Sequence, residues 1–203
     1  MPKSKDSPLD LLTVTNSALL LVDYQPAMFK GIGSGDKNVV RMAAAGAARA
    51  AGILGVPVIL STINPEQNGD LIAEIAAIFP KQKPIARKIP SFDAFEDART
   101  RAAVMKAGRP KLVVSGLWTS MCFTFTALHA LKDGLTVYGL MDATGDSTPA
   151  AYRYGVKRML QAGVVPTTLE SVTSEWMHDW GNPKAGELVQ KVYSKYGAML
   201  GLK

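Results

Sequence analysis

Residues 113–143 read VVSGLWTSMCFTFTALHALKDGLTVYGLMDA, and this stretch decides the fold. It begins with a continuous apolar run, passes through the loop 116–121, and continues as helical sequence from Cys122 until a glycine at 134. A second apolar run follows at 135–141. Strands that are apolar on both faces and are joined by a helix are typical of a parallel sheet covered on both sides. The stretch therefore predicts a strand–helix–strand unit.

The same alternation extends in both directions from this unit. Strand-like runs lie at 18–23, 58–62, 85–88, 111–115, 135–141 and 164–169. Helical patterns lie at 36–54, 71–79, 95–107, 122–133 and 149–162. Gly or Pro residues follow several of these helical patterns, as expected where a helix ends. We therefore predict a single-domain α/β fold with a Rossmann-like, doubly wound sheet of about six mainly parallel strands and helices on both faces.

Composition agrees with one globular domain. The chain has 203 residues, of which 47% are hydrophobic and 20% charged, and a chain of this length can bury a large core without disulfides or structural metals. No low-complexity tract or linker divides it. We expect a flexible N-terminal tail at 1–10 and one domain at 11–203.

Charge and cysteine content bear on partners and location. The single cysteine excludes an internal disulfide, and the apolar run 18–22 is too short for a membrane span, so we expect a cytoplasmic protein with no membrane partner. The formal net charge is +6, but no tract of five or more like charges occurs. Scattered positive residues favour a generic basic surface over a nucleic-acid partner.

Three reactive side chains follow predicted strands, at the edge where doubly wound sheets bind ligands. Cys122 is placed at the start of a helix, where free N–H groups and the helix dipole should hold a thiol pKa below its usual value of about 8.5. Asp23 can accept the thiol proton, and Lys88 can stabilise the thiolate. Each residue alone has an ordinary interpretation: a buried apolar thiol, a turn former and a solvated lysine. Their shared placement favours catalysis.

The two histidines are poor candidates for the base that a nucleophilic thiol usually needs. His129 lies seven residues after Cys122 on the same predicted helix, about 10 Å along its axis. His178 is in a C-terminal segment that follows no predicted strand. A papain-like Cys–His pair is therefore not expected.

Three segments together resemble the isochorismatase-like cysteine hydrolase superfamily, and more narrowly its YcaC-like branch of unassigned specificity. They are ALLLVDYQ (18–25), ARKIPSFDAF (86–95) and the stretch 113–143. The resemblance implies a catalytic triad of Asp, Lys (Arg in some members) and Cys, which maps onto Asp23, Lys88 and Cys122. Short motifs are weak when taken singly, but three in the right order are a specific signal.

The resemblance also implies the reaction. Cys122 would attack the carbonyl carbon of a small amide or related C–N or acyl substrate, and a covalent thioester would then be hydrolysed. The backbone N–H groups of Trp118 and Cys122 would hold the oxyanion. A cis peptide bond is implied at Leu117–Trp118. No cofactor is expected, and the partner is a small-molecule substrate.

Substrate and metal expectations rest on fewer residues. Gln25, Phe29, Trp118 and Phe123 are the candidate lining of the substrate pocket, and the glycine-containing segment 31–36 is predicted to form a flexible loop over the active site. Nicotinamidases of this superfamily hold a metal through a D-x-H-x-H motif after the second strand. The corresponding stretch here, STINPEQNGD (61–70), has no histidine, so we expect no metal site.

Two further expectations concern assembly and alternative activities. Trp176, Met177 and Trp180 form an apolar cluster within 172–180 that suggests a subunit contact, and the resemblance implies a homo-oligomer, with an octamer as one candidate size. The alternatives to the hydrolase are a catalytically idle ligand-binding oligomer of the same fold and an isochorismatase-type vinyl-ether hydrolase. The intact set of three reactive residues argues against the first, and the presence of Cys122 argues against the second.

Overall fold

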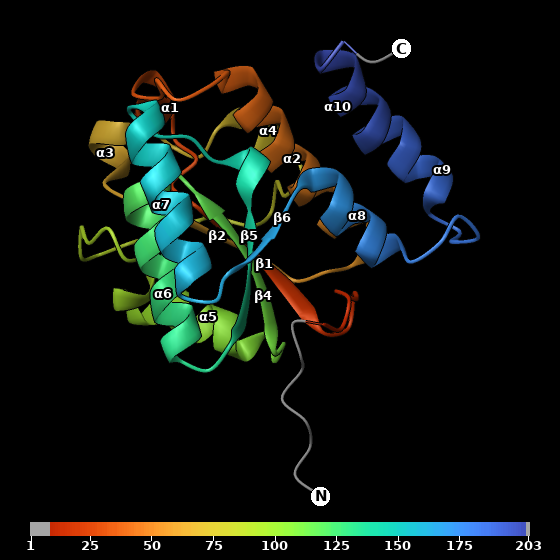
Figure 1. Ribbon diagram of the computed structural model, residues 1–203, viewed down its shortest axis with the longest axis horizontal. Helices are drawn as coiled ribbons and strands as arrows, with labels where there is room; N and C mark the ends of the chain where they lie inside the picture. The colour runs from red at the N-terminus through yellow and green to blue at the C-terminus, as the bar shows by residue number, and fades with distance from the viewer. Residues whose placement is uncertain (1–8, 202–203) are drawn as a thin grey trace, which may run out of the picture.

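The computed structural model describes residues 9–201, which form one layered α/β domain (Figure 1). Most of the predicted tail, residues 1–8, lies outside the described residues. None of the helices within 9–201 has both the length and the apolar character needed to cross a bilayer.

The sheet confirms the predicted fold class. Its strands are β1 (Ser17–Val22), β2 (Val58–Thr62), β3 (Ile85–Ala86), β4 (Lys111–Gly116), β5 (Thr136–Leu140) and β6 (Val165–Thr167). They lie in the order β3-β2-β1-β4-β5-β6, and every neighbouring pair is parallel. The strand order reverses between β1 and β4, so this is the switch point at which such sheets bind ligands.

The helices include all five that the pattern predicts and several that it does not. They are α1 (Pro26–Lys30), α2 (Lys37–Leu54), α3 (Pro65–Asn68), α4 (Ala73–Ala76), α5 (Ala98–Lys106), α6 (Thr124–Lys132), α7 (Pro149–Gln161), α8 (Leu169–Met177), α9 (Ala185–Leu188) and α10 (Ser194–Met199). A π-helical turn, Thr119–Phe123, leads into α6. The short helices α1 and α3 and the C-terminal helices α8–α10 were not predicted, because short or interrupted segments carry little periodic signal.

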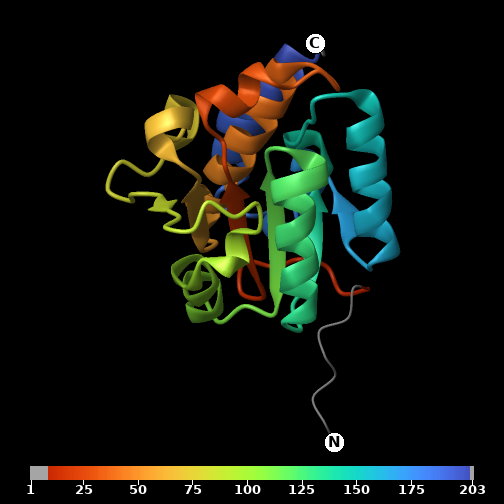
Figure 2. The ribbon, with the colours of Figure 1, turned by 90° about the vertical axis from the view of Figure 1, so that its left-hand side faces the viewer.

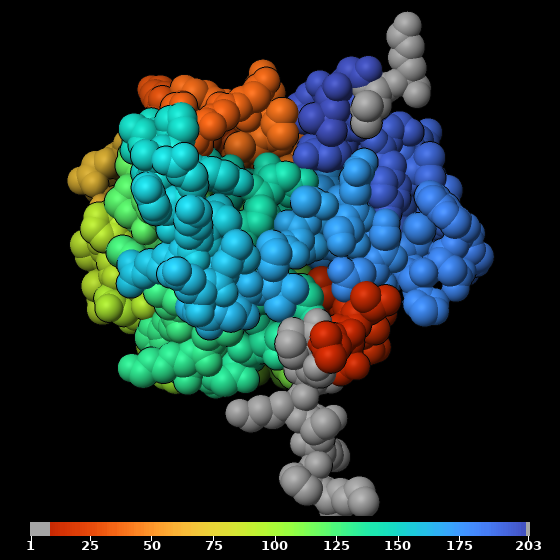
Figure 3. Space-filling view, viewed as in Figure 1, coloured from red at the N-terminus to blue at the C-terminus, as the bar shows by residue number. Residues whose placement is uncertain are grey.

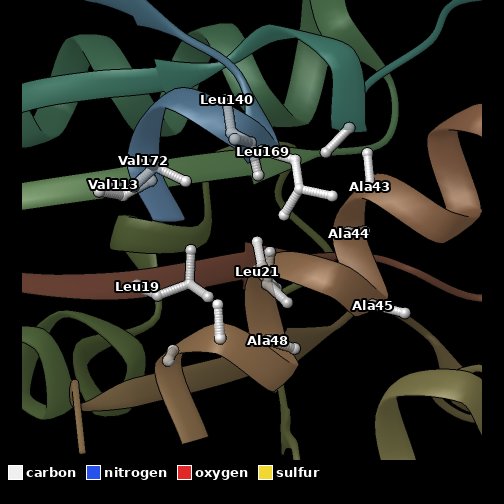
Figure 4. Packing of buried hydrophobic residues seen from close by; sticks show 14 of the residues in the cluster. Leu19, Leu21, Ala43, Ala44, Ala45, Ala48, Val113, Leu140, Leu169 and Val172 are labelled. Atoms are coloured by element: carbon white, nitrogen blue, oxygen red, sulfur yellow. The ribbon is translucent and has the colours of Figure 1, made fainter. Parts of the chain in front are cut away.

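Alternate residues of β1 point to opposite faces of the sheet and enter separate hydrophobic clusters. Leu19 and Leu21 pack with the alanine-rich face of α2 and with Leu169 and Val172 of α8 (Figure 4). Leu20 belongs to the other cluster, together with residues of α5, α6 and α7. Figure 2 shows helices on both sides of the sheet. This two-sided burial explains why the strands read as continuous apolar runs.

The C-terminal helices cover one side of the domain, where Figure 3 shows the segment packed against the rest of the chain. Trp176 and Met177 of α8 are buried in the protein's own core, and Trp176 Nε1 donates a hydrogen bond to Ser17 Oγ at 2.8 Å. Only Trp180 of the expected apolar cluster is exposed, with 71% of its surface accessible. The cluster predicted as a subunit contact is therefore mainly an intramolecular one, since an amphipathic helix can turn its aromatic face toward its own sheet.

Candidate active site

Asp23 is the first residue after β1, and its position is fixed by the backbone. Its N–H donates to the carbonyl of Ser61, and its φ of 62° turns the chain sharply as it leaves the sheet. Its side chain is fully buried. An unpaired carboxylate would be costly in such a place.

Arg87 supplies the charge that balances this carboxylate. Its Nη1 and Nη2 atoms lie 2.7 and 2.8 Å from the two oxygens of Asp23, and neither side chain has accessible surface. The guanidinium also donates to Ser61 Oγ and to the carbonyl of Ser91. This paired two-bond geometry is the strongest form of an arginine–carboxylate contact.

The structure corrects the assignment of Lys88 to this role. The side chain of Lys88 is exposed, and its backbone N–H donates to Asp97 Oδ2 at 2.9 Å. Successive side chains of an extended segment point in opposite directions, so only one of two adjacent cations after β3 can face inward. The inward residue is Arg87.

Cys122 is the third member of this group and lies in the π-helical turn that follows β4. Its side chain is buried and lies close enough to the Asp23 carboxylate for each group to shift the pKa of the other. The backbone N–H of Trp118 also acts on the thiol and lowers its pKa. The peptide bond between Leu117 and Trp118 is cis, as the family resemblance implies. Asp23, Arg87 and Cys122 therefore form one contiguous buried group.

Electrostatics in this group differ from the expectation of an activated thiolate. Burial raises the pKa of the Cys122 thiol above its usual value, and the Asp23 carboxylate beside it raises that pKa further; the Arg87 charge and the Trp118 N–H only partly offset this. Burial also raises the pKa of Asp23, against the opposing effect of Arg87. The group thus consists of a thiol with a raised pKa beside a carboxyl group that is held by a guanidinium. Any reaction at this sulfur would have to include removal of its proton by a base.

A pocket of about 220 Å³ opens over Cys122. The residues that line it are Met28, Ile63, Asn64, Asn68, Pro90, Phe92, Leu117, Trp118, Met121 and Cys122. Trp118 is the only one of the four predicted pocket residues among them. The sequence offered a signal for Asn64, which stands in the turn-forming Asn-Pro pair 64–65, but none for Met28 or Phe92.

The other three predicted pocket residues have structural roles. The Gln25 amide donates to the carbonyls of Ile63, just after β2, and Gly69, just after α3, and so joins the two ends of the segment that contains α3. Phe29 is buried with the Arg41 guanidinium over its ring, and Phe123 is fully buried among the side chains of α5, α6 and α7. Large aromatic and amide side chains near a site are thus core here, with Trp118 the exception.

The loop before Cys122, residues 116–121, is held by the segment after β5. Ser120 N–H donates to Asp146 Oδ2 at 2.7 Å, and Thr119 N–H donates to the Gly145 carbonyl. The backbone carbonyl of Asp146 in turn accepts from the N–H groups of Gly33 and Ser34. The segment 31–36, expected to cover the active site as a flexible loop, is therefore tied by hydrogen bonds to the residues that hold the loop 116–121.

The histidines take no part in the group around Cys122. His129 Nδ1 lies 2.7 Å from Asp93 Oδ2, and His178 is exposed at the end of α8. Within residues 9–201, no three His, Cys, Asp or Glu side chains are grouped so that they could hold a metal ion.

Comparison with known proteins places this geometry in a family. The family model described as Isochorismatase domain matches residues 17–171. The probable hydrolase YcaC of Escherichia coli is 28% identical over 176 residues, which cover 86% of this chain and 84% of that protein.

Solved structures of related proteins point to the same family. The E. coli YcaC structure, described as an octameric hydrolase of unknown specificity, matches with a TM-score of 0.87 over 96% of this chain and 97% of that one, at 28% identity. The Pseudomonas aeruginosa YcaC structure, with hexane-2,5-diol and covalent acrylamide, matches with a TM-score of 0.87 over 96% of this chain and 98% of that one, at 26% identity. The sheet order, the strand-end site and these matches lead to one conclusion: the chain belongs to the isochorismatase family.

Proposed function

We propose that this protein is a cysteine-dependent hydrolase of small amides or related acyl compounds, with Cys122 as nucleophile, Asp23 as acid–base and Arg87 as the residue that positions Asp23. One observation carries the proposal. A single buried carboxylate is hydrogen-bonded by a guanidinium and lies beside the thiol of Cys122, so that each group shifts the pKa of the other. A purely structural cysteine needs neither partner.

Acylation follows from this arrangement. The Cys122 proton moves to Asp23 as the sulfur attacks the carbonyl carbon, and the C–S bond forms while the carbonyl oxygen becomes an oxyanion. The Trp118 N–H, which acts on the thiol in the resting state, would stabilise that oxyanion together with the Cys122 N–H. When the C–N bond breaks, Asp23 returns the proton to the departing amine.

Deacylation uses the same groups in reverse. Asp23 removes a proton from water as the oxygen attacks the thioester carbon, the C–S bond breaks, and the proton returns to the sulfur. The products are the acid and the free thiol. Because the pKa of Cys122 is raised, the thiol is protonated at rest, and Asp23 has to act as base in every turnover.

Arg87 has two effects on Asp23. It offsets part of the cost of burying the carboxylate, so that Asp23 can remain a base, and its two hydrogen bonds fix the plane of the carboxylate. The fully buried guanidinium does not line the pocket, so we assign it a positioning role and no contact with substrate.

Two measurements test the proposal. The first is covalent labelling of the native protein by acrylamide, which is the compound found covalently bound in the P. aeruginosa YcaC structure. Since the chain has one cysteine, intact mass spectrometry identifies the labelled site directly. We expect a single adduct in the native protein and none in Cys122→Ser.

The second measurement is turnover of a panel of small primary amides and hydroxamates, followed by release of ammonia or hydroxylamine. Asp23→Asn and Cys122→Ser should abolish turnover, and Lys88→Met, which changes an exposed cation, should retain it. If the thiol is labelled but no acyl compound is turned over, the catalytically idle interpretation is correct. If the thiol reacts only in denaturant, Cys122 is a structural residue.

We also propose that the chain assembles into a homo-oligomer, as the octameric description of E. coli YcaC suggests. The contact surface is not the buried part of α8, because Trp176 and Met177 pack inside the subunit.

A further inference from the structure

The pocket over Cys122 is lined by uncharged side chains. Seven of its ten residues, all but Asn64, Asn68 and Cys122 itself, are apolar: Met28, Ile63, Pro90, Phe92, Leu117, Trp118 and Met121. The charged side chains of the group around Cys122, Asp23 and Arg87, form an ion pair that has no accessible surface. A charged substrate would therefore find no oppositely charged side chain among the described residues that line the pocket.

Asn64 is the polar side chain that this pocket leaves available. It lies in the left-handed region, with φ of 43°, at the start of α3, and its side chain does not cap that helix. Its backbone carbonyl accepts from two N–H groups of α3, and within residues 9–201 its amide has no hydrogen-bond partner. The neighbouring Asn68 differs, because its amide nitrogen already donates to the Ile63 carbonyl at 2.9 Å. Asn64 can therefore donate to or accept from a bound molecule.

The size of the pocket limits what it can hold. About 220 Å³ is below the range of roughly 300–1,000 Å³ that is usual for drug-sized ligands. Phe92, on the loop between β3 and α5, lies at the pocket with 54% of its surface exposed, so an apolar group of the substrate can cover it and displace water.

We propose that this site selects small, uncharged substrates with an apolar group that packs against Phe92, and that the Asn64 amide hydrogen-bonds their polar group. The inference rests on the proposed function, since it concerns the substrate of the same thiol. A carboxylate on the substrate would lose its hydration on entering the pocket without forming an ion pair there. This desolvation would make its free energy of binding less favourable. The site thus excludes small carboxylic acids and accepts the corresponding neutral amides.

The test compares two alkylating reagents of similar size, iodoacetamide and iodoacetate. In both reactions the Cys122 sulfur forms a bond to the methylene carbon, iodide leaves, and the thiol proton is lost to solvent. Each rate is divided by the rate of the same reagent with a free thiol under the same conditions. We expect the normalised rate for the anion to be at least about tenfold lower than for the amide.

Two matched variants show whether the pocket causes this preference. Phe92→Arg places a cation at the pocket and should reduce the discrimination against iodoacetate several-fold. Ile89→Arg adds the same charge on the same loop at a residue that is equally exposed, 54%, and does not line the pocket, so it should change the discrimination little. Equal effects of the two substitutions would assign the preference to net charge and overturn the inference.

The role of Asn64 has its own test. Asn64→Gly keeps a backbone that tolerates a positive φ and removes the side chain with its amide. It should raise the concentration of acrylamide that half-saturates labelling, without changing the maximal rate. An unchanged half-saturation would contradict the assignment.

Failure of the inference differs from failure of the proposed function. If iodoacetate and iodoacetamide label Cys122 with equal normalised rates, the thiol is reactive but the selectivity is wrong. If no reagent labels the native protein, the proposed function fails, and the substrate class fails with it.

Discussion

Replacing Arg87 with methionine should destabilise the protein strongly, while the same replacement at the adjacent Lys88 should not. Arg87→Met removes the two hydrogen bonds that hold Asp23 and those to Ser61 and Ser91, and it leaves a fully buried carboxylate without a counter-ion. Breaking a buried ion pair by removing one partner costs about 3–5 kcal/mol. Exposed side chains such as Lys88 change stability by less than about 0.5 kcal/mol.

Urea denaturation followed by circular dichroism measures the difference. With a denaturant slope of about 3 kcal/mol per molar, at the upper end of the usual range, the loss corresponds to a fall of about 1 M or more in the midpoint for Arg87→Met. The midpoint for Lys88→Met should stay within about 0.2 M of the original protein. A double variant, Asp23→Asn with Arg87→Met, removes both charges and should recover part of the loss, because no unpaired charge is then buried.

The pH dependence gives an independent check on the cause. Burial raises the folded-state pKa of Asp23 above its unfolded value of about 3.9 even with Arg87 present, and loss of the opposing Arg87 charge raises that pKa further. The folded variant then holds a proton that the unfolded chain releases, so its stability falls as pH rises above that unfolded value. The deficit relative to the original protein should therefore be smaller at pH 5 than at pH 8. A small loss for Arg87→Met, or an equal loss for Lys88→Met, would refute this account of the site.

Three other predictions concern the thiol, metals and assembly. Asp23→Asn should speed alkylation of Cys122 at pH 8 as it abolishes turnover, because the carboxylate contributes to the raised thiol pKa. An unchanged rate would show that Asp23 does not act on the thiol, and a slower one would contradict the claim that it raises the thiol pKa. Turnover of any substrate should survive EDTA, and activity lost to EDTA and restored by zinc or manganese would show that the 61–70 loop had been misinterpreted. Light scattering should give a mass of several chains, and a single-chain mass would refute the oligomer proposal. Trp180→Ala should leave the folded subunit intact, because the Trp180 residue is 71% exposed. Trp176→Ala should destabilise the subunit itself by about 3–5 kcal/mol, because the Trp176 side chain is buried.

The sequence predicted the sheet well because strands buried on both faces leave a clear pattern. All six strands and the five longer helical patterns are present, and the predicted positions after β1 and β4 place Asp23 and Cys122 in contact. The rule that ligands bind at the carboxyl ends of parallel strands was enough to predict that these two residues lie close together.

What the sequence could not provide was side-chain direction. Arg87 and Lys88 are adjacent and chemically alike, and only the backbone geometry after β3 decides which one is buried. The raised thiol pKa likewise depends on the depth of burial and on the distance to Asp23, which no motif specifies. Trp176 and Met177 were expected at a subunit surface because an apolar helical face looks the same whether it packs on its own sheet or on a partner.

The shortest strand of the sheet determines the chemical identity of the cation at the site. Only two residue pairs, Ser61 with Ile85 and Thr62 with Ala86, set the register of β3 against β2. A slip by one residue would exchange the inward and outward positions and bring an ammonium to Asp23 in place of a guanidinium. The bond from the Lys88 N–H to Asp97 holds the chain just beyond these two pairs. Together with the bond from the Arg87 N–H to the Thr62 carbonyl, Asp97, though it touches no reacting atom, helps to keep the carboxylate held by two parallel hydrogen bonds and not by a single mobile charge.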